Sequence, residues 1–270
     1  MTVFGAASAK WWWNSWQEGG FLNALTAGLT AAGGVNDVWR VGGRRVSDTP
    51  KLKAHWSLLT GMANQLSEKD GHFLWSGADS FSDRRAGGHL LARYLNKIVE
   101  IAPQEAIRIV AHSHGCNVVK EASADASLDR RVLFQRVVFL ACPHFAGKND
   151  RGFVLHHRLA PARFRKILNL YSMGDTVQTK IAQGVAGPFG ANPNDFVPAV
   201  AHRIEQDGIA RHLYEDCAIR TLDQGTAAHT AMHGMRVGYL TGRWLAGENL
   251  QQILHRAGST SLPVPRGDFG

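Results

Sequence analysis

"AIRIVAHSHGCNVVKEA", residues 106–122, is the stretch that decides the predicted fold. Its first part, "IRIV", is short and apolar and predicts a buried strand, whereas "CNVVKEA" predicts a helix. Ser113 stands between the two, and the small residues Ala111 and Gly115 lie two positions before and after it. Larger side chains there would collide across a sharp strand-to-helix turn. The pattern therefore predicts a nucleophile elbow with Ser113 at its tip; a purely structural turn is the alternative.

Strand-like and helical patterns alternate along the whole chain. Short apolar runs bounded by turn residues predict strands at 2–5, 37–41, 72–75, 106–111, 136–141, 166–171 and 217–222. Longer amphipathic segments predict helices at 20–29, 51–66, 82–101, 114–126 and 233–245. Such alternation favours the α/β class, with a mostly parallel central sheet and helices on both faces.

The length of 270 residues suits one such domain. We expect a single domain over residues 1–257, with candidate cap or lid insertions at 151–166 and 182–216, and a flexible tail at 258–270. The sequence has no stretch of apolar residues long enough for a membrane span and no secretory signal pattern, so we expect a cytoplasmic protein, with signal-less export left open. The three cysteines fit reduced thiols better than disulfides.

The formal net charge of +8 is dispersed along the chain. No recognition-helix or RNA-binding pattern accompanies it, so we expect no nucleic-acid partner and favour attraction to an anionic substrate or lipid surface. The segment 151–166 mixes apolar and basic residues, and as a helix it would suit peripheral contact with anionic lipid. A solvated surface helix is the favoured alternative, and Pro161 weakens any single helix there.

The elbow belongs to a wider pattern. In chain order this comprises "VFGAASAKWWW", "HFLWSGADSFSDRRAGGHL", "RIVAHSHGCNVV" with "VVFLACPHF", and "NLYSMGDTVQ" with "AHTAMHGMRVGYLTGRWL". In these segments the chain resembles the α/β-hydrolase superfamily, and within it lipase-like members such as the bacterial type VI lipase effectors and related serine esterases. The resemblance implies an α/β-hydrolase fold and a serine hydrolase of the esterase or lipase class, acting on carboxylic or lipid esters through a catalytic triad.

The family order of the triad is serine, acid, histidine. Asp175 follows a predicted strand where the family's acid lies; capping of a following helix is the alternative, and the reserve acids are Asp195, Asp207, Asp216 and Asp223. The base belongs between the last strand and the last helix, where His229 and His233 stand. His229 is favoured because Met232 follows it at the family's spacing, and His233 is the alternative base.

Acyl transfer also needs donors for the oxyanion. The resemblance implies the backbone N–H of His114 and a second donor near Ala6 or Ala7, although Phe4-Gly5 stands where many relatives have His-Gly. Candidate substrate-binding residues are aromatic: Trp11, Trp12, Trp75 and Phe145. For Trp11 and Trp12, packing over the sheet is an equal alternative. We expect the side chains of His112 and His114 to point away from Ser113 and to shape the pocket or pack.

The expected reaction uses no metal and no organic cofactor. A metal hydrolase is disfavoured, because the sequence has no H-E-x-x-H and no clustered carboxylates. The alternative function is a non-catalytic α/β-hydrolase-like protein that binds a ligand or lipid. A cognate immunity protein is an expected partner only if the chain is a secreted effector.

Overall fold

The computed structural model describes residues 21–33, 81–101, 103, 106–146, 157–175, 199–201, 209–221, 225–256 and 263–264. The strands predicted at 2–5, 37–41 and 72–75 and the helix predicted at 51–66 lie outside the described residues.

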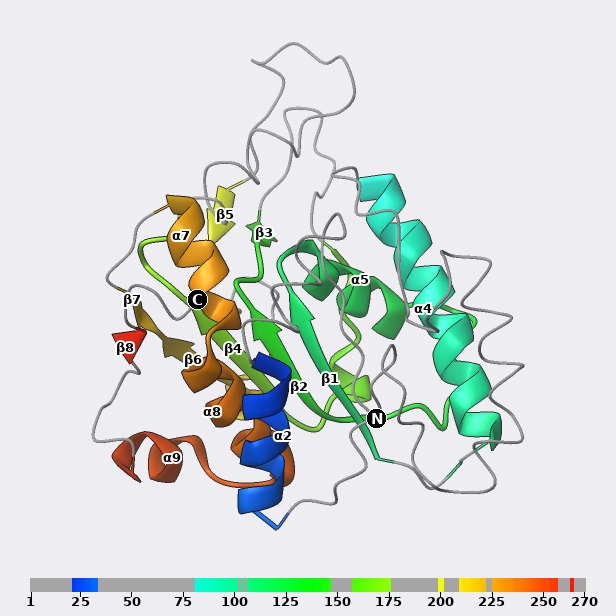
Figure 1. The fold of residues 1–270 in the computed structure, drawn as a ribbon. Coiled ribbons are helices and arrows are strands. Elements are labelled where there is room, and N and C mark those ends of the chain that lie inside the picture. Colours follow the sequence, from blue (N-terminus) through cyan, green and yellow to red (C-terminus); the bar gives the residue numbers. More distant parts are fainter. Residues whose placement is uncertain are drawn as a thin grey trace.

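Parallel strands form the central sheet of the described part of the chain (Figure 1). They are β1 (Ile107–His112), β2 (Phe134–Leu140), β4 (Ile167–Tyr171) and β6 (Tyr214–Ala218), and they lie side by side in the order β1-β2-β4-β6. Each pairs with its neighbour in parallel. Because all the strands run the same way, their carboxyl ends meet at one edge of the sheet. The predicted α/β class is confirmed.

Helices cover both faces of this sheet (Figure 1). One face packs against α4 (Phe81–Ile101) and α5 (His114–Ser123), which share a buried cluster with Ile109 and Ala111 of β1. The other face packs against α2 (Phe21–Ala31), α8 (Met235–Ala246) and α9 (Leu250–Arg256), which share a second cluster with Val110. Successive residues of β1 therefore enter opposite cores, as expected of a doubly covered parallel strand.

The last sheet strand begins earlier than its predicted span of 217–222, since β6 starts at Tyr214. Residues 214–216 therefore belong to the sheet, although they fall within the candidate insertion at 182–216. Glu215 and Asp216 are charged and only partly buried, because β6 is the last strand of the described sheet. Its sequence therefore lacks the continuous apolar run that is typical of a central parallel strand.

Short elements complete the described chain. The strands β3 (His144–Ala146) and β5 (Ala199–Ala201) pair antiparallel, and β7 (Arg220–Thr221) pairs in parallel with β8 (Pro263–Val264). The remaining helical turns are η1 (Pro161–Arg163), η4 (Arg211–Leu213), α7 (Gly225–Thr230) and η5 (Ala231–His233). The strand β8 lies within the expected flexible tail at 258–270, where its extended backbone pairs with β7.

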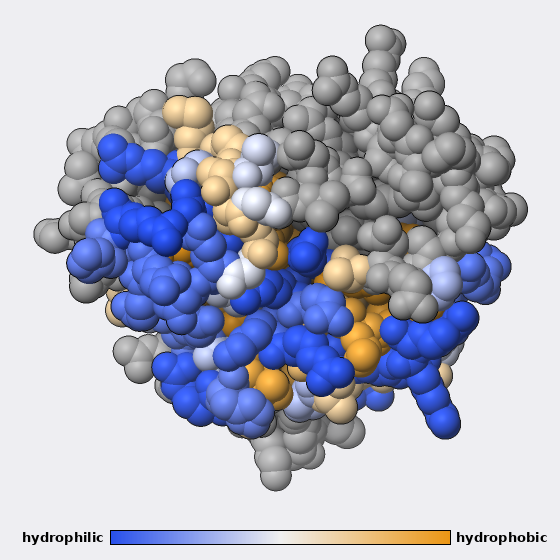
Figure 2. Space-filling view, turned by 90° about the horizontal axis from the view of Figure 1, so that it is seen from below, coloured by the Kyte–Doolittle hydropathy of each residue, from blue (hydrophilic) through white to orange (hydrophobic). Residues whose placement is uncertain are grey.

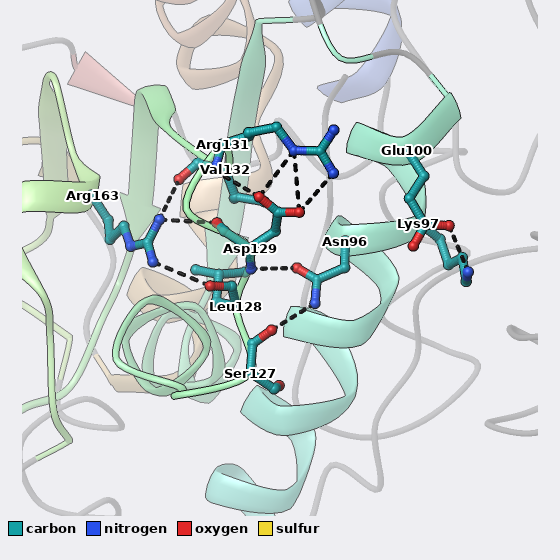
Figure 3. Close-up of polar contacts among 9 residues, drawn as sticks. All are labelled: Asn96, Lys97, Glu100, Ser127, Leu128, Asp129, Arg131, Val132 and Arg163. Carbon is teal, nitrogen blue, oxygen red and sulfur yellow. Dashed lines mark hydrogen bonds and ion pairs between the residues drawn. The ribbon is translucent and has the colours of Figure 1, made fainter.

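The described part of the segment 151–166, residues 157–166, is not an amphipathic helix, so that expectation is wrong there. Only η1 is helical, and Phe164 is buried against Phe134. Pro161 lacks the backbone N–H that the interior of an α-helix requires. The guanidinium of Arg163 donates hydrogen bonds to backbone carbonyls of the turn at 128–132, which Figure 3 shows. This basic side chain therefore holds a turn.

The visible face of the molecule in Figure 2 is mainly hydrophilic where residues are described. Within the described ranges, no helix is both long and apolar enough to cross a membrane. The exposed large hydrophobic side chains in these ranges are Met173, Met235 and Tyr239.

The helices α2 and α8 approach each other through glycines. A Cβ atom on Gly242 would lie 2.0 Å from the carbonyl oxygen of Leu25, and one on Gly28 would lie 2.2 Å from that of Tyr239. Both obstacles are backbone atoms, which cannot rotate away as a side chain does. The absence of a side chain at these positions is what permits the contact.

We expect Gly242→Ala to lower the free energy of unfolding by about 1–3 kcal/mol, because the new methyl group forces the two helix backbones apart. This loss outweighs the roughly 1 kcal/mol that alanine gains in helix propensity. Thermal unfolding of the native and variant chains measures the difference. An unchanged or raised melting temperature would contradict the close packing of α8 on α2.

Candidate active site

Ser113 occupies a strained turn at the carboxyl end of β1. Its φ is 51° and its ψ is −131°, a positive-φ conformation that residues with a side chain rarely adopt. The turn is held by backbone hydrogen bonds: the Ser113 N–H donates to the carbonyl of Leu140 at 2.9 Å, and its carbonyl accepts from the N–H of Cys116 at 3.0 Å. The helix α5 begins at the next residue, His114. The predicted strand–serine–helix turn is thus present.

Asp175 and His229 form a buried pair. Asp175 follows β4, and His229 lies in α7 after β6 and β7. The His229 Nδ1 and the Asp175 Oδ2 are 2.6 Å apart, and the two residues are 2 % and 1 % exposed. With the proton on Nδ1 donated to the carboxylate, the Nε2 of the neutral ring keeps its lone pair. This imidazole can then accept a proton through Nε2 while the carboxylate stabilises the resulting cation.

The residue before Ser113 lies near His229. The ring centroids of His112 and His229 are 4.6 Å apart, and the imidazole of His112 also hydrogen-bonds to the backbone of His229. The structure thus brings the Asp175–His229 pair to the same end of β1 as the strained serine.

His233, the alternative base, lies in η5 and has different neighbours. Its ring is 4.1 Å from that of His112 and 6.3 Å from that of Phe21, measured between centroids. The Asp175 carboxylate instead accepts a hydrogen bond from His229. The geometry therefore favours His229 over His233 as the partner of the acid.

Three of the histidines around Ser113 are held neutral. Burial lowers the pKa of His112, His114 and His233 well below the ordinary value of 6.5, and neighbouring positive groups lower each further. A histidine whose pKa is depressed in the fold binds a proton more readily once the chain unfolds. Acid therefore favours the unfolded state.

We expect the free energy of unfolding to fall as the pH drops below 6.5, the unfolded value of these histidines. Each contributes a loss of up to about 1.4 kcal/mol per pH unit until its folded pKa is reached. Denaturant unfolding between about pH 7 and pH 5 measures this slope. His233→Phe removes one titrating ring and should make the slope shallower, whereas a stability independent of pH over this range would contradict the neutral cluster.

The other predicted site residues divide in two groups. The backbone N–H of His114, the predicted oxyanion donor, lies at the start of α5 next to Ser113. Phe145 lies in β3, and its side chain lies outside what the structure describes. The remaining predicted site residues fall outside the described ranges: Ala6, Ala7, Trp11, Trp12 and Trp75.

The reserve acids do not compete with Asp175 within the described ranges. Asp216 lies in β6 and accepts a hydrogen bond from the side-chain amide of Asn169 at 2.8 Å. Asp195, Asp207 and Asp223 lie outside the described residues.

Sequence reasoning missed a buried charged side chain beside the site. Arg84 is fully buried, and its Nη1 is 3.4 Å from the Nδ1 of His114. From the sequence, Arg84 was considered only as part of the dispersed positive charge. Its position could have predicted its burial, because Arg84, Gly88 and Leu91 follow the spacing of the buried face of α4.

A second buried polar chain links α5 to the sheet. Lys120 donates to the Nδ1 of His144 at 3.0 Å, and the Nε2 of His144 lies 3.2 Å from the Oδ1 of Asn169. The amide of Asn169 in turn donates to Asp216. Since lysine and the amide NH₂ only donate, the proton of His144 lies on Nε2 and every bond in the chain runs toward the carboxylate. This network compensates the burial of the Lys120 ammonium.

The described residues contain no group of three or more histidine, cysteine, aspartate or glutamate side chains arranged to hold a metal ion. In comparisons with known proteins, no family model and no curated sequence matched this chain.

Proposed function

We propose that the chain is a serine hydrolase with an α/β-hydrolase fold, acting on carboxylic esters. The observation that carries the proposal is the buried Asp175–His229 pair at 2.6 Å, at the same end of the sheet as the strained Ser113. The order of the parts supports it as well, because the serine, acid and histidine follow β1, β4 and β6 of one parallel sheet. Ligands of open α/β sheets bind at this carboxyl edge.

The proposed reaction uses these side chains in turn. The Oγ of Ser113 attacks the ester carbonyl while the Nε2 of His229 takes its proton, and Asp175 holds the imidazolium through Nδ1. The oxyanion accepts a hydrogen bond from the backbone N–H of His114. Collapse of this intermediate breaks the bond to the alcohol, which leaves with the proton from His229. Water, activated by the same ring, then releases the acid and regenerates Ser113.

Turnover of para-nitrophenyl esters by the native chain tests the proposal. We expect hydrolysis that saturates with substrate and that persists in the presence of EDTA, since the proposed reaction involves no metal. A folded chain that binds a hydrophobic ester without hydrolysing it would instead support the ligand-binding alternative.

A further inference from the structure

Arg84 lies in the first turn of α4, beside the residue that follows Ser113. Its Nε donates to the Nε2 of His157 at 2.8 Å, and its Nη1 is 3.4 Å from the Nδ1 of His114. The guanidinium also lies over the ring of Phe81, 4.7 Å from its centroid. A fully buried arginine is rare and costly, so the contacts that hold it require explanation.

The hydrogen bonds around Arg84 fix the protons on two histidine rings. Arginine only donates, so the Nε2 of His157 and the Nδ1 of His114 both accept. The proton of neutral His157 then lies on Nδ1, which is 3.0 Å from the Oε1 of Glu121, and that of His114 lies on Nε2. Arg84 thus donates in two directions, to His114 on one side and to His157 on the other, and His157 donates in turn to the buried carboxylate of Glu121.

This chain is anchored on two closely packed helices. Glu121 and His114 lie on α5, two turns apart, whereas Arg84 lies on α4. A Cβ atom on Gly88 of α4 would lie 2.5 Å from the Cβ of Glu121, so the two helices touch with no side chain between them. The guanidinium is thereby held between α4 and the first turn of α5.

We infer that Arg84 is a positioning residue of the active site, which holds His114 in place and sets a fixed positive charge beside the oxyanion. The inference rests on the proposed function. The carbonyl of the bound ester is neutral, whereas the tetrahedral intermediate carries a negative charge, so a fixed cation stabilises the intermediate more than the substrate. Its loss should therefore lower kcat and leave KM nearly unchanged.

The kinetic test compares Arg84→Met and Arg84→Lys with Arg93→Met, which removes an exposed arginine from the same helix. We expect Arg84→Met to lower kcat for a para-nitrophenyl ester by about 10–100-fold with KM within about threefold. Arg84→Lys, which keeps the charge, should recover part of this loss, and Arg93→Met should match the native chain. A folded Arg84→Met variant with native kcat, or one changed only in KM, would overturn the inference.

The histidine tautomers test the inference without relying on turnover. In a long-range ¹⁵N–¹H spectrum of the native chain, His114 should be the neutral Nε2–H form and His157 the neutral Nδ1–H form. In Arg84→Lys the His114 signals should shift. Opposite tautomers in the native chain would overturn the inference even if Arg84→Met does not fold. A native chain that has these tautomers but neither turns over esters nor reacts with a serine-directed probe would refute the proposed function, and with it the catalytic part of the inference.

Discussion

Ser113→Ala is expected to lower kcat for para-nitrophenyl butyrate by about 10⁵-fold or more, to the level supported by binding and the oxyanion donors alone. The variant lacks the oxygen that forms the acyl-enzyme, so no covalent route remains. The change deletes only a hydroxyl from a buried turn that is fixed by backbone bonds to Leu140 and Cys116, so we expect the fold to persist.

Ser127→Ala is the matched control, because it removes a hydroxyl from an exposed turn that follows the C-terminal end of α5. We expect native kcat and KM from this variant. A folded Ser113→Ala chain that keeps more than about a tenth of the native kcat would contradict the assignment of the nucleophile.

His229→Ala is expected to lower kcat by about 10⁵-fold, because the hydroxyl of Ser113 then has no base to take its proton. The Asp175 carboxylate, buried beside the missing ring, also loses its partner at 2.6 Å. Steady-state kinetics of the purified variant, with circular dichroism to verify folding, measure the effect.

His233→Phe provides the comparison for this prediction. Phenylalanine keeps an aromatic ring against His112 and Phe21, and it cannot accept a proton. We expect kcat within about tenfold of the native value. The reverse outcome, with His233→Phe inactive and His229→Ala active, would assign the base to His233 and leave the observed carboxylate pair without a catalytic role.

The parts of the fold that were predictable are those set by local pattern. The apolar run before Ser113 and the small residues around it defined β1, the turn and the start of α5. The beginning of β6 was not predictable in this way, because Glu215 and Asp216 interrupt its apolar character. The segment around Arg163 was misjudged because its mix of apolar and basic residues suggested an amphipathic helix, whereas only η1 is helical and the guanidinium of Arg163 binds backbone carbonyls.

The candidate site was predictable only in part. Asp175 and His229 are 54 residues apart, and nothing in their spacing joins them; the expectation came from the order of parts in a resembling family. Arg84 was missed for a physical reason: residue type predicts an exposed side chain, whereas its position on α4 predicts a buried one. In the fold, position prevails because the rings of His157 and His114 accept the hydrogen bonds of the guanidinium.

Labelling with a fluorophosphonate probe, followed by intact-mass analysis and localisation of the adduct, tests the central claim most directly. The proposed function predicts one adduct per native chain, on Ser113, that is absent from Ser113→Ala and His229→Ala and present in His233→Phe. A folded native chain that takes up no probe, or that carries it on another residue, would contradict the claim.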